Sequence, residues 1–250
     1  MSINPDRLAS TFISLCEIDS PARKEGRLAN HLKKLFSLMG ADEIIEDESA
    51  ALTGSDCGNL IIRFKGRGLP LEPIFFNCHM DVISPCDGVK VRFKNGLFSS
   101  RGETVLGGDD KGGLAILIEA MQTLLDNEVP FGPVEFLFTT CEEVGLLGAK
   151  AFDAALLSSK IGYSLDSTGI DVVITGAPAA KYVVAKIFGL AAHAGLHPEQ
   201  GISAIQIAAQ AVGKLQLGLL DDESTANIGL ISGGTATNII PDYVELRGEV

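Results

Sequence analysis

The sequence is poor in cysteine, in positive charge and in long apolar runs, and each shortage excludes a class of protein. Five cysteines in 250 residues, with no Cys-x-x-Cys pair, are too few for a disulfide scaffold and are expected to be reduced thiols. The 20 basic residues face 32 acidic ones, and the net charge of −12 argues against nucleic acid or an anionic membrane as a partner. No apolar run reaches the roughly 20 residues of a membrane-spanning helix.

The N-terminal segment MSINPDRLAS lacks both the basic stretch and the apolar stretch of a secretory signal. Together with the reduced thiols, this predicts a cytoplasmic location. With 46% hydrophobic residues the chain is too apolar to be disordered, and its length allows one large domain or two modest ones.

Helical and strand-like segments alternate along the first part of the chain, which predicts an α/β fold with a mostly parallel sheet. After the small residues GAPAA at 176–180, a strand–helix–strand–strand order indicates a smaller α+β unit. We therefore expect one domain over residues 1–177 and a second over residues 178–250. The expected helices are Pro5–Cys16, Lys24–Met39, Gly112–Leu125, Gly148–Leu157 and Ser203–Leu215, and the expected strands are Asn59–Phe64, Ile74–Cys78, Val134–Thr139, Ile161–Leu165, Tyr182–Phe188, Thr225–Ile231 and Tyr243–Val250.

Metal-capable side chains stand at four places where an apolar run stops. In open α/β sheets, ligands bind outside the carboxyl ends of the strands, so side chains at these positions are expected to meet at one rim. Clustered carboxylates repel one another unless a cation neutralises them, and imidazole with carboxylate oxygens suits Zn²⁺, with Mn²⁺ or Co²⁺ as alternatives. The side chains are His79 and Asp81 after IFFNC, Asp109 and Asp110 after VLGG, Glu142 and Glu143 after VEFLFTTC, and Asp166 after IGYSL.

The spacing within these groups predicts different roles for neighbouring residues. His79 and Asp81 alternate along the chain, so Asp81 can lie behind the imidazole and orient it towards a metal. Glu142 and Glu143 are adjacent, and successive side chains diverge. One of them can therefore bind metal while the other acts as a general base.

Several ordered motifs resemble the di-zinc superfamily of peptidase T, carboxypeptidase G and succinyl-diaminopimelate desuccinylase. The motifs are HMD at 79–81, GGDDKGG at 107–113, CEEVGLLGAK at 141–150, SLD ending at Asp166, GLAAHAGLHPEQGISA at 189–204 and GGTATNIIPD at 233–242. The similarity is greatest to peptidase T-like tripeptidases. It implies a catalytic metal-binding domain over residues 1–177 and a ferredoxin-like lid and dimerisation domain over residues 178–250.

The resemblance also assigns roles to single residues. It implies that two Zn²⁺ per subunit activate a water, that Glu142 is the general base, and that Asp81 orients His79. It further implies that His193 reaches the active site of the partner subunit in a homodimer and stabilises the oxyanion, while Asn238 lines the substrate pocket. The implied metal ligands are His79 and Asp166 on one zinc, Glu143 on the other, and Asp109 as the bridge, with Asp110 as a less favoured alternative bridge.

The function that follows is hydrolysis of amide bonds in small peptides, with a tripeptide aminopeptidase as the leading interpretation. An N-acyl amino-acid amidohydrolase and a carboxypeptidase of the same superfamily remain alternatives. The family has a further His ligand on the second metal and a lid Arg, but no His follows His197 in this sequence. We therefore expect a C-terminally truncated enzyme, or else a non-catalytic metal-binding fragment.

Overall fold

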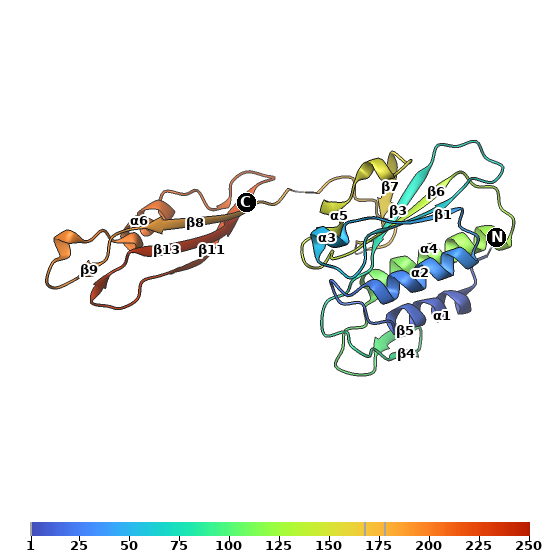
Figure 1. Ribbon diagram of the computed structural model, residues 1–250, viewed down its shortest axis with the longest axis horizontal. Helices are drawn as coiled ribbons and strands as arrows, with labels where there is room; N and C mark the ends of the chain where they lie inside the picture. Colours follow the sequence, from blue (N-terminus) through green and yellow to red (C-terminus); the bar gives the residue numbers. More distant parts are fainter. Residues whose placement is uncertain (1, 168, 178) are drawn as a thin grey trace. The chain divides into compact units, whose positions relative to one another are not determined.

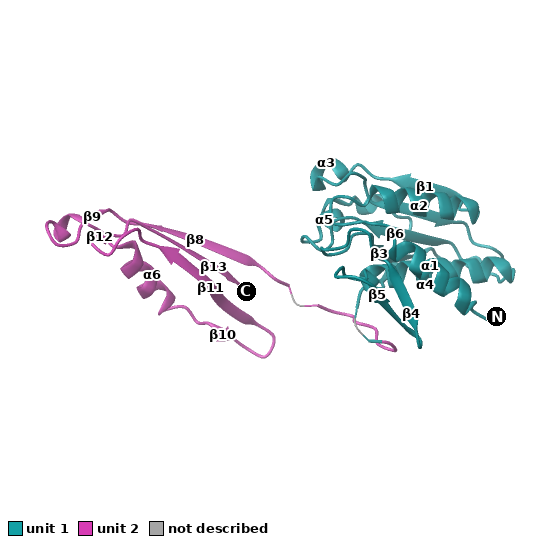
Figure 2. Ribbon diagram, turned by 90° about the horizontal axis from the view of Figure 1, so that it is seen from below, with its two compact units in different colours: residues 1–169 teal, residues 170–250 magenta. Residues whose placement is uncertain are grey.

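The computed structural model describes residues 2–167, 169–177 and 179–250 of the chain. The chain divides into two units, Met1–Gly169 (unit 1) and Ile170–Val250 (unit 2), which are coloured separately in Figure 2. Each unit has its own cluster of buried apolar side chains, so each has a core of its own. Unit 1 contains most of the candidate metal-binding and catalytic residues predicted from the sequence.

Unit 1 is built on a five-stranded sheet with the strand order β1-β2-β6-β3-β7. Strands β3, β6 and β7 pair in parallel, while β2 is antiparallel to both β1 and β6. Four of these five strands therefore run in the same direction, which confirms the predicted mostly parallel α/β sheet. The strands of unit 1 are β1 (Glu43–Glu46), β2 (Leu60–Phe64), β3 (Ile74–His79), β6 (Val134–Thr139) and β7 (Ile161–Ser164), with β4 (Val91–Lys94) and β5 (Leu97–Ser100) as a separate hairpin.

Helices α1, α2 and α4 lie together on one side of this sheet (Figure 1). The core between them is rich in aromatic rings: Phe36 of α2 lies with its centroid 5.3 Å from Phe136 and 5.6 Å from Phe138 of β6. Burying such side chains is what fixes the helices on the sheet. The helices of unit 1 are α1 (Pro5–Cys16), α2 (Gly26–Leu38), α3 (Ala50–Thr53), α4 (Gly108–Asp126), α5 (Leu147–Ala151) and the short 3-10 helix η1 (Ala154–Leu156).

Unit 2 is a four-stranded antiparallel sheet with the order β10-β11-β13-β8, packed on helix α6. Its core includes Ala204 and Ala208 of α6 against Val244 and Leu246 of β13. This arrangement confirms the predicted smaller α+β unit. Its elements are β8 (Tyr182–Phe188), β9 (Ala192–His193), η2 (Pro198–Gln200), α6 (Ala204–Val212), β10 (Gly218–Leu219), β11 (Thr225–Gly233), β12 (Ile239–Ile240) and β13 (Tyr243–Glu249).

One predicted helix differs from the structure. The stretch Gly148–Leu157 forms α5 and then η1, because Phe152 is extended and the Asp153 side chain starts a new turn by accepting the N–H of Ala155 at 2.9 Å. The five cysteines are free and buried. Within the described residues, we find no helix long and apolar enough to span a bilayer.

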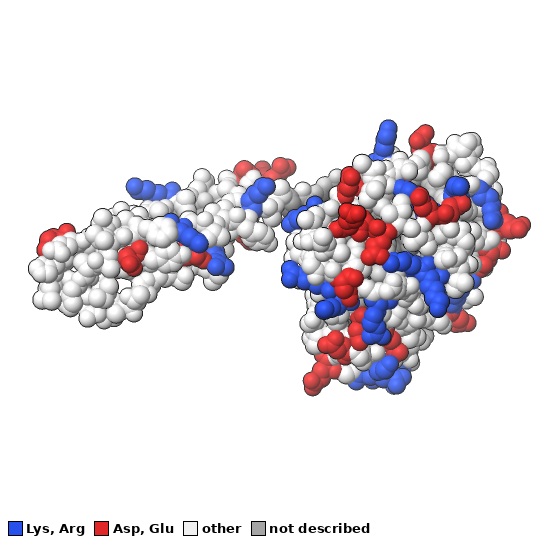
Figure 3. Space-filling model, in the orientation of Figure 1, with Lys and Arg blue, Asp and Glu red and all other residues white. Residues whose placement is uncertain are grey.

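Charged side chains are unevenly distributed over the surface. On the face drawn in Figure 3, unit 1 shows many charged side chains of both signs, including one connected group of acidic ones, whereas those of unit 2 are more scattered. Several large apolar side chains of unit 2 are exposed, including Tyr182, Phe188 and Leu230. An apolar surface of this kind is typical of a protein–protein interface.

Candidate metal centre

The site is built around His79, the last residue of β3. Its side chain is only 2% exposed, and its Nε2 lies 3.1 Å from Oδ1 of Asp109 and 3.9 Å from Oδ1 of Asp166. Ligand atoms of these three residues all lie within 4.8 Å of one another. The same holds for His79 with Glu142 and Glu143, so one imidazole is shared by two groups of carboxylates.

The topology explains why these residues meet. His79 ends β3, Glu142 and Glu143 follow β6, and Asp166 follows β7, and these three strands are parallel neighbours. Their carboxyl ends therefore open at the same rim of the sheet. Asp109 reaches the rim from the first turn of α4.

The two adjacent aspartates at the start of α4 point in different directions. Asp109 is 74% exposed and faces the imidazole. Asp110 is buried, and its carboxylate accepts the backbone N–H groups of His79 at 3.3 Å and of Gly113 at 3.2 Å. This geometry favours Asp109 over Asp110 as the side chain available to a metal.

Asp81 holds the site in a way that the sequence did not indicate. Nδ1 of His79 lies 2.8 Å from the backbone oxygen of Asp81 and 3.6 Å from its carboxylate. The buried carboxylate accepts instead the backbone N–H groups of Glu142 at 2.9 Å and Glu143 at 3.1 Å. Asp81 thus orients the imidazole through its main chain and the two glutamates through its side chain.

The pKa shifts reflect crowding of acids around one base. Burial alone would lower the pKa of His79, but the carboxylates of Asp81 and Asp109 outweigh it and raise that pKa to about 10. Burial is the main cause that raises the pKa values of Glu142, Glu143 and Asp166. The neighbouring carboxylates raise these pKa values further, while the charge of His79 opposes the shift. The donor set therefore fits a divalent cation, which neutralises the carboxylates and replaces the proton on the imidazole.

Two predicted residues, His193 and Asn238, lie in unit 2, where they are neighbours. His193 pairs with Ile239 between β9 and β12, and the backbone oxygen of Asn238 accepts the N–H of Ala194 at 2.9 Å. Nδ1 of His193 accepts the N–H groups of Gly195 and Leu196. A neutral His193 ring therefore carries its proton on Nε2, where it can serve as a hydrogen-bond donor.

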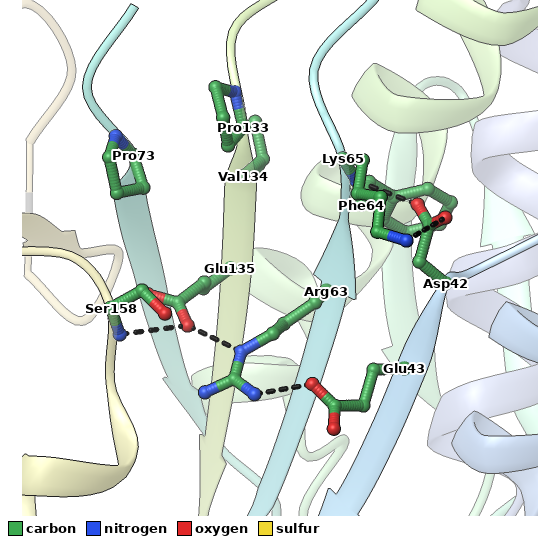
Figure 4. Close-up of a pocket in the computed structure, with 10 residues that line it drawn as sticks. All are labelled: Asp42, Glu43, Arg63, Phe64, Lys65, Pro73, Pro133, Val134, Glu135 and Ser158. Carbon is green, nitrogen blue, oxygen red and sulfur yellow. Dashed lines mark hydrogen bonds and ion pairs between the residues drawn. The ribbon is translucent and has the colours of Figure 1, made fainter.

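Two other features of unit 1 are formed by residues outside these two groups. A cavity of about 440 Å³ opens at the amino ends of β3 and β6, where Arg63 lies between Glu43 and Glu135 (Figure 4). A third group of metal-capable atoms joins Glu25, Asp56 and Cys57. The carboxylate oxygens of Glu25 already accept hydrogen bonds, so this group lacks the open ligands of the rim.

A mostly parallel sheet with an imidazole and carboxylates at its carboxyl rim, followed by a small α+β unit, is the architecture of a metallopeptidase. The family model described as Peptidase family M28 matches residues 59–187, and that described as Peptidase dimerisation domain matches residues 176–250. The chain belongs to the metallopeptidase superfamily that includes peptidase T and carboxypeptidase G.

Individual relatives agree with this assignment. The chain is 44% identical over 248 residues to the uncharacterized protein YqjE of Bacillus subtilis, covering 99% of this chain and 66% of the relative. The crystal structure of aminopeptidase PepT from Bacillus cereus matches with 43% identity and a TM-score of 0.94, and that of a tripeptidase from Staphylococcus aureus with 38% and 0.91. Each structural match covers 99% of this chain and 66% of the other.

Proposed function

We propose that the protein is a metal-dependent hydrolase of small peptides, and that tripeptides are its substrates. The observation that carries this proposal is the position of His79 between two carboxylate groups at the rim of the sheet. The similarity to an aminopeptidase and a tripeptidase supports the substrate class. Since the chain spans 66% of these relatives, the activity of the whole protein is part of the proposal.

In this proposal His79, Asp109, Asp166 and Glu143 would hold two Zn²⁺, or Mn²⁺ or Co²⁺ in their place. When bound, the metal ions lower the pKa of a coordinated water and polarise the substrate carbonyl. Glu142 accepts the proton of the attacking water, and its raised pKa suits a base that must return this proton to the leaving amine. Asp81 holds both glutamates by their backbone N–H groups throughout.

Unit 2 would complete the site through a homodimer. Residues 178–250 form the lid and dimerisation domain in this account, and residues 1–177 form the catalytic domain. The Nε2–H group of His193 from one subunit would donate a hydrogen bond to the oxyanion in the other, with Asn238 lining the substrate pocket. The proposed location is the cytoplasm.

The substitution Glu142→Gln tests the assignment of the base. It removes the proton acceptor while keeping the shape of the side chain, so turnover of tripeptides should fall by about 10²–10⁴-fold with the metal content unchanged. Metal analysis and a hydrolysis assay on the same sample measure both quantities. The matched control is Glu128→Gln, a change at an exposed glutamate after α4, which should leave both unchanged.

The same assay separates the substrate classes. Faster hydrolysis of N-acyl amino acids, or of N-terminally blocked dipeptides with a free carboxylate, would replace tripeptides with the substrate of an amidohydrolase or of a carboxypeptidase. Metal binding without hydrolysis of any of these compounds would contradict the enzymatic proposal. Nearly full activity in Glu142→Gln would remove Glu142 from its role.

A further inference from the structure

The segment Thr140–Glu143, here called the glutamate loop, is held by side chains from distant parts of the chain. Beyond Asp81, which accepts the last two N–H groups, the N–H of Cys141 donates to Oε1 of Glu25 at 2.9 Å. Cys141 has a φ of +54°, a left-handed conformation that residues other than glycine seldom adopt. A strong acceptor at this N–H stabilises the conformation that turns the next two residues towards the rim.

Glu25 is suited to hold the N–H of Cys141 because hydrogen bonds to both of its carboxylate oxygens fix its side chain. Its side chain is fully buried at the amino end of α2, and no basic side chain accompanies it among the contacts that the structure describes. The Oε1 atom also accepts the N–H of Arg23 at 3.0 Å, and Oε2 accepts the hydroxyl of Ser55 at 2.5 Å. A carboxylate buried in this way is costly unless it accepts hydrogen bonds. Cys141 of the glutamate loop supplies two of them, from its N–H and, at 3.4 Å, from its thiol.

Asn59 completes the set of acceptors. Its Oδ1 accepts the N–H of Thr140 at 3.0 Å, while its Nδ2 donates to the backbone oxygen of Gly148 at 3.0 Å. Four consecutive backbone N–H groups of the glutamate loop therefore donate to buried side chains, two of them to Asp81. Carbonyl groups of the loop accept backbone N–H groups of residues 145–148, so these side-chain acceptors and the turn that follows hold the loop together.

We propose that Glu25 is a positioning residue for Glu142 and Glu143, acting through the backbone N–H of Cys141. The inference rests on the proposed function, since it assigns Glu25 a part in arranging the proposed base and the proposed metal ligand. Glu25 does not contact the imidazole or the rim carboxylates itself. Removing it should let the loop move and so weaken metal binding without removing any ligand.

The experiment compares Glu25→Ala and Glu25→Gln with wild-type protein. The alanine variant loses the acceptor for Cys141, whereas glutamine keeps a carbonyl oxygen in the same place. Amide hydrogen exchange of Thr140–Glu143 should accelerate by about tenfold or more in Glu25→Ala, and Co²⁺ affinity should fall by about 10–100-fold with an altered visible spectrum. Glu25→Gln should stay within about threefold of wild type in both measurements.

Glu135→Ala is the matched control. Glu135 is also a buried glutamate that accepts backbone N–H groups, from Ser158 and Ser159, but it lies at the opposite end of β6. Its loss should destabilise the unit while leaving both the exchange of the glutamate loop and Co²⁺ binding unchanged. If Glu25→Ala does not fold, Glu25→Asp replaces it, since the shorter side chain withdraws the same carboxylate from Cys141.

The two readouts separate the inference from the proposed function. Failure of the wild-type protein to bind Co²⁺ would contradict the proposed function, and loop exchange would still decide the role of Glu25. Unchanged exchange in the Glu25 variants, or Co²⁺ affinity equal to that of Glu135→Ala, would overturn the inference. Faster exchange together with weaker Co²⁺ binding in Glu25→Ala, rescued in Glu25→Gln, would support it.

Discussion

At the scale of single residues, His79 governs the electrostatics of the rim. It is the one histidine in the metal-capable groups found among the described residues, and carboxylates approach it from both sides. Their charge overcomes the effect of burial and raises its pKa to about 10. At neutral pH the metal-free imidazole is therefore protonated and held as an ion pair, and a metal must displace that proton.

This proton makes metal affinity depend on pH. Because the metal competes with a proton on His79, apparent Zn²⁺ affinity should rise by about tenfold or more per pH unit between about pH 6 and pH 8, below the raised pKa. Calorimetric titrations across this range measure the slope. His197→Gln, a change at an exposed histidine of unit 2, should leave the slope unchanged. Zn²⁺ affinity independent of pH would contradict the protonated state of His79.

A single glycine also controls the glutamate loop. A Cβ at Gly148 would lie 2.3 Å from the backbone oxygen of Thr140 and 2.6 Å from Oδ1 of Asn59, where no atom fits. Gly148→Ala should therefore lower the free energy of unfolding by about 1–3 kcal/mol and weaken Zn²⁺ binding. Urea unfolding measures the first effect.

The matched control for Gly148→Ala lies in α4. A Cβ at Gly112 meets no atom within 4 Å, and alanine is the better helix former. Gly112→Ala should therefore raise stability by about 0.5–1 kcal/mol. If the two substitutions changed the free energy of unfolding equally, the close approach of Thr140 and Asn59 would not be the reason that position 148 requires glycine.

At the scale of elements, the sequence predicted the helices and strands whose apolar residues recur at a regular spacing. The bounds of α1, β6 and β8 match the expected ranges, because their apolar residues repeat at the spacing of a helix or a strand. Strand β1 was not predicted, since its four residues, EIIE, carry too short a pattern. The expected helix Gly148–Leu157 was wrong in its length, because local capping by Asp153 outweighed helical periodicity.

The metal-capable residues were predictable for a similar reason. His79, Glu142 and Asp166 stand at or just after the ends of apolar strands, so the fold class indicates where they lie, whereas Asp109 opens α4. Glu25 and Asn59 gave no such signal. Their contacts with the glutamate loop join residues far apart in the sequence, and only the folded chain brings these together.

An ion-pair network joins two elements of unit 1. Glu119 of α4 is almost fully buried and binds Arg7 of α1 at 2.6 Å, and Arg7 also pairs with Asp126. The Arg7 guanidinium is the main cause that lowers the pKa of Glu119. Stability from this carboxylate is therefore present above its unfolded pKa of about 4.3 and is lost as the pH falls towards the lower folded value.

Glu119→Gln tests this pairing of α1 and α4. The variant should unfold with a free energy lower by about 1–3 kcal/mol at neutral pH, and the difference should shrink below about pH 4. Urea unfolding at both pH values measures it, with Glu72→Gln at an exposed position as the control. A difference that stays constant into acid would contradict the lowered pKa.

At the scale of the whole molecule, the order of the motifs along the chain identified the family. Six motifs stand in sequence from HMD at 79–81 to GGTATNIIPD at 233–242, and short contiguous motifs can be read without a structure. The change of pattern after residue 176 predicted a second unit from residue 178, whereas the two compact units of the structure divide after Gly169. The hydrogen bonds that orient the rim could not be predicted, because they depend on how distant segments pack.

The central claim is that the rim around His79 binds metal. Crystals of the protein grown with Zn²⁺, measured at the zinc absorption edge, test it by anomalous difference density. The account predicts the strongest peak between His79, Asp109 and Asp166. A map without a peak there, or with its strongest peak at Glu25, Asp56 and Cys57, would contradict the account.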